Sequence, residues 1–360
     1  MAAIDALLVA LKERSGSDLH LAAGTPPRLR VKGNLDAIES HAALDDASLR
    51  ALLREIVTAE QWSEYERDGD LDFAYGLPGV ARFRANYLVQ QNGAGAVFRI
   101  IPEQILTVEQ LGLPPAITKL ADLNKGLVLV TGPTGSGKST TLAAIVDRIN
   151  KSHRKHIVTI EDPIEFVHQN QNSVLSHREV GTHTQGFGPA LRAAIRQDAD
   201  VVLVGEMRDR ETIALAITAA EMGMLVFGTL HTNSAAKTID RIIDAFPAKE
   251  QNQVRISLSE SLAAVVSQLL VPTADGKGRS AVHEILLRTS ALPNIIREGK
   301  ITMLNSLIEG GKAQGMQTMD DTLFGLVKAG KIRGSDAYMK ATNKSRFESV
   351  SGADEQSSAA

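Results

Sequence analysis

The chain has 360 residues, of which 43% are hydrophobic and 22% charged, a composition typical of a globular protein with about two domains. The formal net charge of −3 gives no global attraction to nucleic acid, so no nucleic-acid partner is expected. The absence of cysteine excludes disulfides, thiolate zinc sites and cysteine nucleophiles.

The start of the chain predicts an amphipathic helix and not a signal peptide, because Asp5 comes early and no basic region precedes the apolar residues. No apolar run approaches the roughly 20 residues that cross a membrane. The absence of cysteine is compatible with a reducing compartment. These features predict a soluble, cytoplasmic protein.

Residues 1–101 predict a small α+β domain. Its helices are expected over 2–14 and within 41–65, and its strands near Leu19 and over 29–31, 72–75, 81–90 and 96–101. In the strand over 81–90, Arg82 and Arg84 alternate with apolar residues and therefore share the polar face. A solvated strand face and an anion-binding face both fit this pattern.

Residues 102–118 are rich in proline and glycine and predict a linker, and residues 119–345 predict an α/β domain. Short apolar strands alternate there with amphipathic helices, which is typical of a mostly parallel sheet with helices on both faces. The strands are expected over 127–130, 157–160, 201–204, 225–227 and 281–286. Helices are expected over 235–246 and 252–270, and again after the last strand to about residue 340. Residues 346–360 predict a disordered tail.

A complete phosphate-binding loop, Gly-Pro-Thr-Gly-Ser-Gly-Lys-Ser, runs from Gly132 to Ser139 between a predicted strand and a predicted helix. The glycines allow positive φ angles, so that successive amides can face a polyphosphate at a helix N-terminus. Lys138 is expected to reach the β- and γ-phosphates and the Ser139 hydroxyl to bind Mg²⁺. The predicted nucleotide-binding residues are Gly132, Pro133, Thr134, Gly135, Ser136, Gly137, Lys138, Ser139 and Thr140.

The nucleotide is predicted to be ATP. Proteins that select guanine commonly carry Asn-Lys-x-Asp, and both Asn-Lys pairs of this chain, at 124–125 and 343–344, lack the acidic residue.

Polar groups follow each of the central strands: an acidic cluster over 161–165, Glu206 after the next strand, and His231 after the one beyond it. The ends of parallel strands meet at one edge of the sheet, where ligands bind. Carboxylates there suit Mg²⁺ and the orientation of an attacking water. Helix capping is the alternative for the acidic cluster, and a structural role is the alternative for His231.

Taken together, the motifs resemble those of the type IV pilus retraction ATPases (PilT-like) in the secretion ATPase superfamily that includes GspE and VirB11. The resemblance covers residues 18–332. Besides the phosphate loop, it rests on the segments 18–21, 79–84, 93–99, 159–168, 204–209 and 228–232. It implies a PAS-like N-terminal domain, a RecA-like ATPase domain, a homo-hexamer and ATP hydrolysis that drives pilus retraction and twitching motility. It also implies a pilus platform protein of the inner membrane as the partner.

The resemblance also implies roles for single residues. Glu206 takes the Walker B position and is the favoured residue to polarise water, with Glu161 as its competitor. Glu165 belongs to the same acidic box and is a candidate metal ligand together with Ser139. His231 matches the histidine box.

Two arginines, Arg84 and Arg99, fall in the region that supplies arginine fingers to a neighbouring subunit, and Arg82 is close behind them.

Four other functions remain open. Pro293 stands where the retraction-specific motif has arginine, which favours an accessory retraction paralogue. A pilus-assembly or secretion ATPase would usually carry a tetracysteine zinc module, and this chain has no cysteine. A RecA-like DNA translocase should respond to DNA, and a nucleotide-binding regulator would not hydrolyse ATP.

Overall fold

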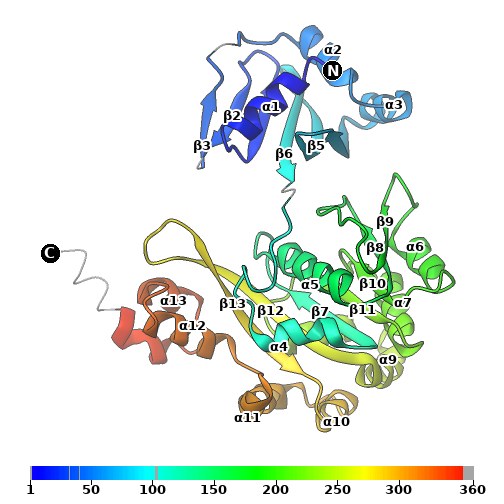
Figure 1. Ribbon diagram of the computed structural model, residues 1–360, viewed down its shortest axis with the longest axis vertical. Helices are drawn as coiled ribbons and strands as arrows, with labels where there is room; N and C mark the ends of the chain where they lie inside the picture. The colour runs from blue at the N-terminus through cyan, green and yellow to red at the C-terminus, as the bar shows by residue number, and fades with distance from the viewer. Residues whose placement is uncertain (1, 32, 40, 102–103, 352–360) are drawn as a thin grey trace. The chain divides into compact units, whose positions relative to one another are not determined.

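The computed structural model describes residues 2–31, 33–39, 41–101 and 104–351 (Figure 1). The chain forms two compact units. The N-terminal unit comprises residues 1–104 together with 163–167, and the C-terminal unit comprises 105–162 and 168–360.

The N-terminal unit is built on a six-stranded sheet in the order β3-β2-β1-β6-β5-β4, in which every pair is antiparallel. Its elements are α1 (Asp5–Glu13), β1 (Asp18–Ala22), β2 (Arg28–Val31), β3 (Asn34–Ala37), α2 (Asp46–Arg54), α3 (Ala59–Asp68), β4 (Asp70–Leu77), β5 (Ala81–Gln90) and β6 (Gly93–Ile101). The predicted helical stretch within 41–65 is thus two helices, and β3 was not predicted.

One face of this sheet carries the core of the unit. Along β5 the residues Phe83, Ala85 and Tyr87 are fully buried, while Arg84 between them is exposed. Tyr87 packs edge-on against Phe73 and Tyr65, and helices α1, α2 and α3 contribute leucines and aromatics to the same cluster. The period-two alternation therefore sets which face is buried, and the arginines share the other face as predicted.

The C-terminal unit contains a seven-stranded sheet in the order β13-β12-β7-β11-β10-β8-β9. Its strands are β7 (Gly126–Thr131), β8 (His156–Glu161), β9 (Val174–Glu179), β10 (Val201–Val204), β11 (Leu225–Leu230), β12 (Leu262–Pro272) and β13 (Arg279–Leu287). All neighbours are parallel except β12 and β13. The four central strands predicted from apolar runs are confirmed, and β9 was not predicted.

Helices cover both faces of this sheet, as expected. On one face α7 (Arg210–Glu221) and α8 (Ala235–Asp244) pack on one set of alternate strand residues. On the other face α5 (Lys138–Ser152) packs on the second set, which includes Val128 and Val130. The remaining helical segments of the unit are α4 (Pro115–Thr118), η1 (Lys119–Asp122), α6 (Phe187–Ala194), α9 (Ala248–Ser261), α10 (Leu292–Arg297), η2 (Ile301–Met303), α11 (Leu304–Gly310), η3 (Lys312–Gln314), α12 (Met319–Lys328), α13 (Gly334–Lys340) and η4 (Lys344–Phe347).

The helix predicted over 252–270 is wrong in its second half. Helix α9 ends at Ser261, and the chain continues directly into β12. Ala264, Val265 and Val266 are consecutive and all fully buried, which requires burial on both faces of a strand. A short apolar run does not reveal by periodicity alone whether it is a buried strand or a buried helix.

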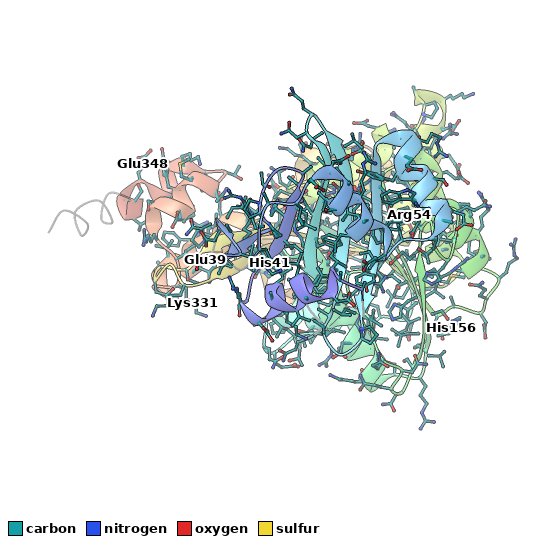
Figure 2. All side chains as sticks on the ribbon, turned by 90° about the horizontal axis from the view of Figure 1, so that it is seen from above. Glu39, His41, Arg54, His156, Lys331 and Glu348 are labelled. Atoms are coloured by element: carbon teal, nitrogen blue, oxygen red, sulfur yellow. The ribbon has the colours of Figure 1, made fainter. Side chains whose placement is uncertain are left out.

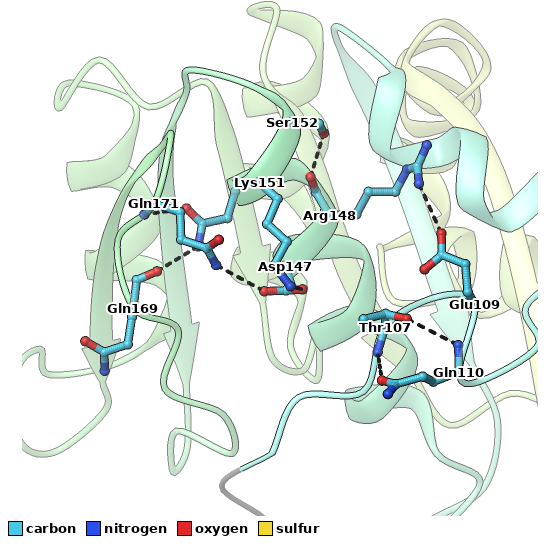
Figure 3. A network of polar contacts seen from close by, with 10 residues as sticks. Thr107, Glu109, Gln110, Asp147, Arg148, Lys151, Ser152, Gln169 and Gln171 are labelled. Carbon is cyan, nitrogen blue, oxygen red and sulfur yellow. Dashed lines mark hydrogen bonds and ion pairs between the residues drawn. The ribbon is translucent and has the colours of Figure 1, made fainter.

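Most of the predicted linker belongs to the C-terminal unit. Val108 and Ile117 are buried in the core cluster that also contains α5 residues. Glu109 accepts a hydrogen bond from Arg148 of α5 at 3.4 Å (Figure 3). Thr107 and Gln110 close a reciprocal pair of hydrogen bonds at 2.9 and 3.2 Å that shapes the turn. Residues from 105 onward are therefore packed chain, and 102–103 lie outside the described residues.

The predicted disordered tail is ordered over 346–351. Phe347 is fully buried, and its ring lies edge-on to Phe324 of α12 at 5.8 Å between centroids. Glu348, labelled in Figure 2, follows it in the C-terminal helical segment. The apolar phenylalanine outweighs the polar composition around it because it completes the cluster of α12 and α13. Residues 352–360 lie outside the described residues.

Among the residues that the structure describes, no helix combines the length and the hydrophobicity needed to span a membrane.

Candidate nucleotide-binding site

The phosphate loop follows β7 and leads into the N-terminus of α5, as predicted. Gly132, Gly135 and Gly137 have φ angles of 146°, 76° and 86°, in a backbone region that residues other than glycine rarely adopt. A Cβ added to Gly132 would lie 2.2 Å from the backbone oxygen of Gln268. The loop therefore needs glycine both for its turns and for close approach to the strand beside it.

Lys138 is the first residue of α5, and its side chain turns back over the loop. Nζ donates hydrogen bonds to the carbonyl oxygens of Gly132 at 2.8 Å and Pro133 at 3.1 Å. The side chain is only 9% exposed. A buried ammonium over the loop places a positive charge where phosphates of a nucleotide would lie.

The rest of the loop offers polar groups to an anion. Pro133, Thr134 and Gly135 are exposed, and Ser139 and Thr140 are half-buried in the first turn of α5. The Ser136 hydroxyl is buried and finds no hydrogen-bond partner in the part of the chain that the structure describes. A phosphate oxygen would satisfy such a donor, so the loop suits a polyphosphate on its own chemistry.

Backbone hydrogen bonds tie the ends of the four central strands together. The Gly205 amide donates to Ile160 at 2.8 Å, the Met207 amide to Thr229 at 3.0 Å, and the Gly132 amide to Leu230 at 3.2 Å. The loop and the segments after β8, β10 and β11 consequently form one edge. This is the arrangement predicted from the polar residues at the strand ends.

Glu206 and His231 meet at this edge. Glu206 Oε1 lies 3.0 Å from His231 Nε2, and its Oε2 lies 2.7 Å from an Arg208 guanidinium nitrogen. The hydrogen bond from Arg208, with smaller contributions from the charge of Arg208 and from His231, holds the pKa of Glu206 below its usual value despite partial burial. Glu206 is therefore an ionised acceptor at neutral pH.

We expect Glu206 to stabilise the fold in a pH-dependent way. Because its pKa is lower in the folded chain than its ordinary value of 4.5, its contribution is present above that pH and is lost as pH falls through the folded pKa. The difference in Tm between wild type and Glu206→Gln should hold from about pH 8 to pH 5 and shrink below about pH 4.5. Thermal unfolding across this range, with the exposed Glu221→Gln as matched control, measures it. A difference that does not vary with pH would contradict the assignment.

The two acidic-box residues lie in different units. Glu161 ends β8, is 9% exposed and belongs to the C-terminal unit, where it pairs in register with Glu179 of β9. Glu165 is exposed and lies in the segment 163–167, which groups with the N-terminal unit. The structure therefore places Glu161 at the strand edge, and the pairing of Glu165 with Ser139 stays a prediction.

Arg84 and Arg99 lie directly opposite each other on β5 and β6. Arg99 contacts the buried Asp18 carboxylate at 2.7 Å, and Arg84 lies 3.8 Å from Asp72. The side chain of Arg99 is 69% exposed and that of Arg84 is 50% exposed. Burial alone would raise the pKa of Asp18, but hydrogen bonds from Ser17 and Arg99 bring it below its usual value. Two adjacent exposed guanidinium groups on one sheet face remain able to meet an anion.

Three residues near this site were not predicted to have a role: Arg208, Gln268 and His283. Arg208 lies within the motif segment 204–209, two residues after Glu206, and its contact with Glu206 is seen only in the structure. Gln268 and His283 are buried polar residues on β12 and β13. For both residues the available signal was a polar residue within a buried apolar run. The wrong helix prediction over 252–270 concealed this signal for Gln268, whereas His283 lies in the strand predicted over 281–286.

The fold and the site define a phosphate-loop nucleotide-binding protein with a parallel-sheet domain and a smaller α+β domain. The family model described as type II/IV secretion system protein matches residues 2–323. The chain belongs to this family.

Two relatives from Pseudomonas aeruginosa match most of the chain. The type IV pilus retractation ATPase PilT is 51% identical over 344 residues, covering 96% of this chain and 99% of that protein. The type IV pilus ATPase PilU is 41% identical over 335 residues, covering 93% of this chain and 87% of that protein.

A crystal structure of the pilus retraction motor PilT with bound ADP superposes with a TM-score of 0.89. It is 42% identical and covers 96% of this chain and 98% of that one. The predicted fold class, a RecA-like phosphate-loop domain with a smaller N-terminal α+β domain, is confirmed.

Proposed function

We propose that this protein is an ATP-hydrolysing motor that drives type IV pilus retraction and twitching motility. The observation that carries the proposal is an intact phosphate loop with Lys138 and the Glu206–His231 pair at the same sheet edge, in a chain 51% identical to a retraction ATPase over 344 residues.

ATP would bind through the loop amides and Lys138, with the Ser136 hydroxyl donating to a phosphate oxygen. The Ser139 hydroxyl at the start of α5 would hold Mg²⁺, with Glu165 as a further oxygen donor. When bound, Mg²⁺ neutralises charge on the β- and γ-phosphates. Every protein group in this set is an oxygen, nitrogen or backbone donor of the type that phosphate and Mg²⁺ require.

Glu206 would orient the attacking water. Its low pKa makes it a weak base but a permanent acceptor, which suits positioning in a reaction that depends mainly on geometry and charge. His231 already contacts Glu206 and, 47% exposed, can also reach a ligand at this edge. Its proposed role is to report whether a γ-phosphate is present. Glu161, buried at the end of the neighbouring strand, remains the competitor for the role of Glu206.

Arg84 and Arg99 would act on the nucleotide of a neighbouring subunit in a homo-hexamer. Both are exposed on a single strand pair, and their mutual repulsion is only partly offset by Asp18 and Asp72. A developing charge on a transferred phosphoryl group would complete the neutralisation. The proposed setting is the cytoplasmic side of the inner membrane, at a pilus platform protein, without nucleic acid as a partner.

Replacing both arginines should therefore remove turnover without removing the ring. Arg84→Ala with Arg99→Ala is expected to lower kcat by about a thousandfold, since arginine fingers contribute roughly that much. The measurement is ATPase activity against protein concentration, with oligomeric mass followed on the same samples. Arg54→Ala with Arg67→Ala, two arginines on the helices of the same unit, is the control. Turnover per subunit that stays constant down to monomer would contradict action in trans.

The cellular test is complementation. In a type IV piliated host that lacks all its own retraction ATPases, expression of this chain should restore twitching, and Lys138→Ala should not. A chain that restores twitching only beside a second retraction ATPase would instead be an accessory paralogue. Pro293, the reason to consider that alternative, lies in the first turn of α10, where a missing backbone N–H breaks no helical hydrogen bond. ATPase activity that rises with added DNA would favour a translocase.

A further inference from the structure

A buried glutamine of β12 lies against the phosphate loop. Gln268 is 2% exposed, and its Nε2 donates to the Ser136 carbonyl oxygen at 2.7 Å. Its Oε1 accepts a hydrogen bond from the Thr141 hydroxyl, in the first turn of α5, at 2.8 Å. One side-chain amide thus joins the loop to the helix that follows it.

The orientation of this amide is determined by its partners. The Ser136 carbonyl can only accept, so the amino group must face it and Oε1 must face Thr141. His283 of β13, in register with Gln268, places Nε2 3.2 Å from the same Oε1. Burial lowers the pKa of His283 to about 4, so at neutral pH the ring is neutral and its single N–H can point at Oε1.

Two loop glycines are fitted to this same residue. A Cβ on Gly132 would lie 2.2 Å from the Gln268 backbone oxygen, and a Cβ on Gly137 would lie 2.8 Å from Gln268 Nε2. Both distances are shorter than any real Cβ contact. The backbone of the loop therefore lies directly against β12 at Gln268. The position of the loop depends on the hydrogen bonds that Gln268 makes to Ser136 and Thr141.

We propose that Gln268 is a positioning residue for ATP hydrolysis, with His283 orienting its amide. It acts through the loop: by holding Ser136 and Thr141 it keeps the loop amides and Lys138 turned toward the phosphates before the nucleotide arrives. A preformed loop binds without having to be ordered, which favours both affinity and turnover. This inference rests on the proposed ATPase function.

The test compares Gln268→Leu with Gln317→Leu. Gln317 donates to the His283 carbonyl oxygen at 3.1 Å. Its replacement therefore also removes a glutamine hydrogen bond to the β12–β13 strand pair, but Gln317 does not contact the phosphate loop through this bond. We expect Gln268→Leu to weaken binding of a fluorescent ADP analogue and to raise KM for ATP by about tenfold, the cost of a buried unpaired group. Gln317→Leu should change both by less than about twofold. Tm of each variant gives its stability.

A second pair of variants keeps the test decisive if Gln268→Leu does not fold. Thr141→Val removes the hydrogen bond to the Gln268 amide while keeping the size of the residue 141 side chain, and should weaken nucleotide binding by about threefold. Thr141→Ser keeps the hydroxyl and should recover most of the lost affinity. Unchanged affinity and KM in folded Gln268→Leu would overturn the proposal, as would an equal loss in Gln317→Leu. Wild-type protein that binds nucleotide but hydrolyses none would count against the proposed function, while the affinity comparison would still decide the role of Gln268.

Discussion

Lys138→Ala is expected to weaken nucleotide binding by about two orders of magnitude in Kd. Lys138 is a buried cation that contacts the loop itself, with its Nζ 2.8 and 3.1 Å from the Gly132 and Pro133 carbonyl oxygens. Alanine removes the charge that would pair with the β- and γ-phosphates, and nothing else among the loop residues carries a positive charge. A charge-assisted contact of this kind contributes about 3 kcal/mol, or about two orders of magnitude in Kd.

The measurement is the Kd of a fluorescent ATP analogue together with steady-state ATPase activity. Lys151→Ala is the matched control because Lys151 lies on the same helix and contacts Asp147 at 2.6 Å, half exposed (Figure 3). Lys151 lies in the last turn of α5, at the end of the helix away from the loop, so its replacement should leave nucleotide binding unchanged. A Lys138→Ala variant with wild-type affinity would show that the loop does not hold the phosphates.

Glu206→Gln should separate binding from hydrolysis. Glutamine keeps the shape of the side chain and can still contact Arg208 and His231, so nucleotide affinity should stay within about twofold of wild type. The variant loses the negative charge and one acceptor position, which are what an oriented water requires. Turnover should fall by about a hundredfold to a thousandfold, the scale typical of one lost transition-state contact.

Single-turnover and steady-state assays on wild type, Glu206→Gln and Glu161→Gln decide between the two carboxylates. If Glu206 orients water, its variant binds ATP but hydrolyses it slowly, and Glu161→Gln retains more activity. Near-normal turnover in Glu206→Gln would assign the role to Glu161, which is buried at the end of the adjacent strand. Circular dichroism and Tm of each variant confirm that the fold is kept.

The local features of this site could be predicted from sequence because each depends on a short stretch of chain. The loop glycines take positive φ as expected, since only glycine adopts those turns without strain. The central strands were identified because fully buried parallel strands appear as continuous β-branched runs. The position of Glu206 and His231 at one edge followed from the rule that parallel strands end together.

Other features depended on contacts between distant parts of the chain. Residues 262–270 form a strand because β7 offers them a parallel partner, and the amphipathic pattern of α9 before them suggested only more helix. The pairing of Glu206 with His231, and of Gln268 with Ser136 across 132 residues, arises from the order of strands in the sheet. Periodicity indicates which face of a helix or strand is apolar. A specific polar contact can be predicted only when the position of its partner in space is known. The loop motif and the expected class of site therefore follow from a short stretch of sequence, whereas the contact of Gln268 with the loop depends on how distant strands pack.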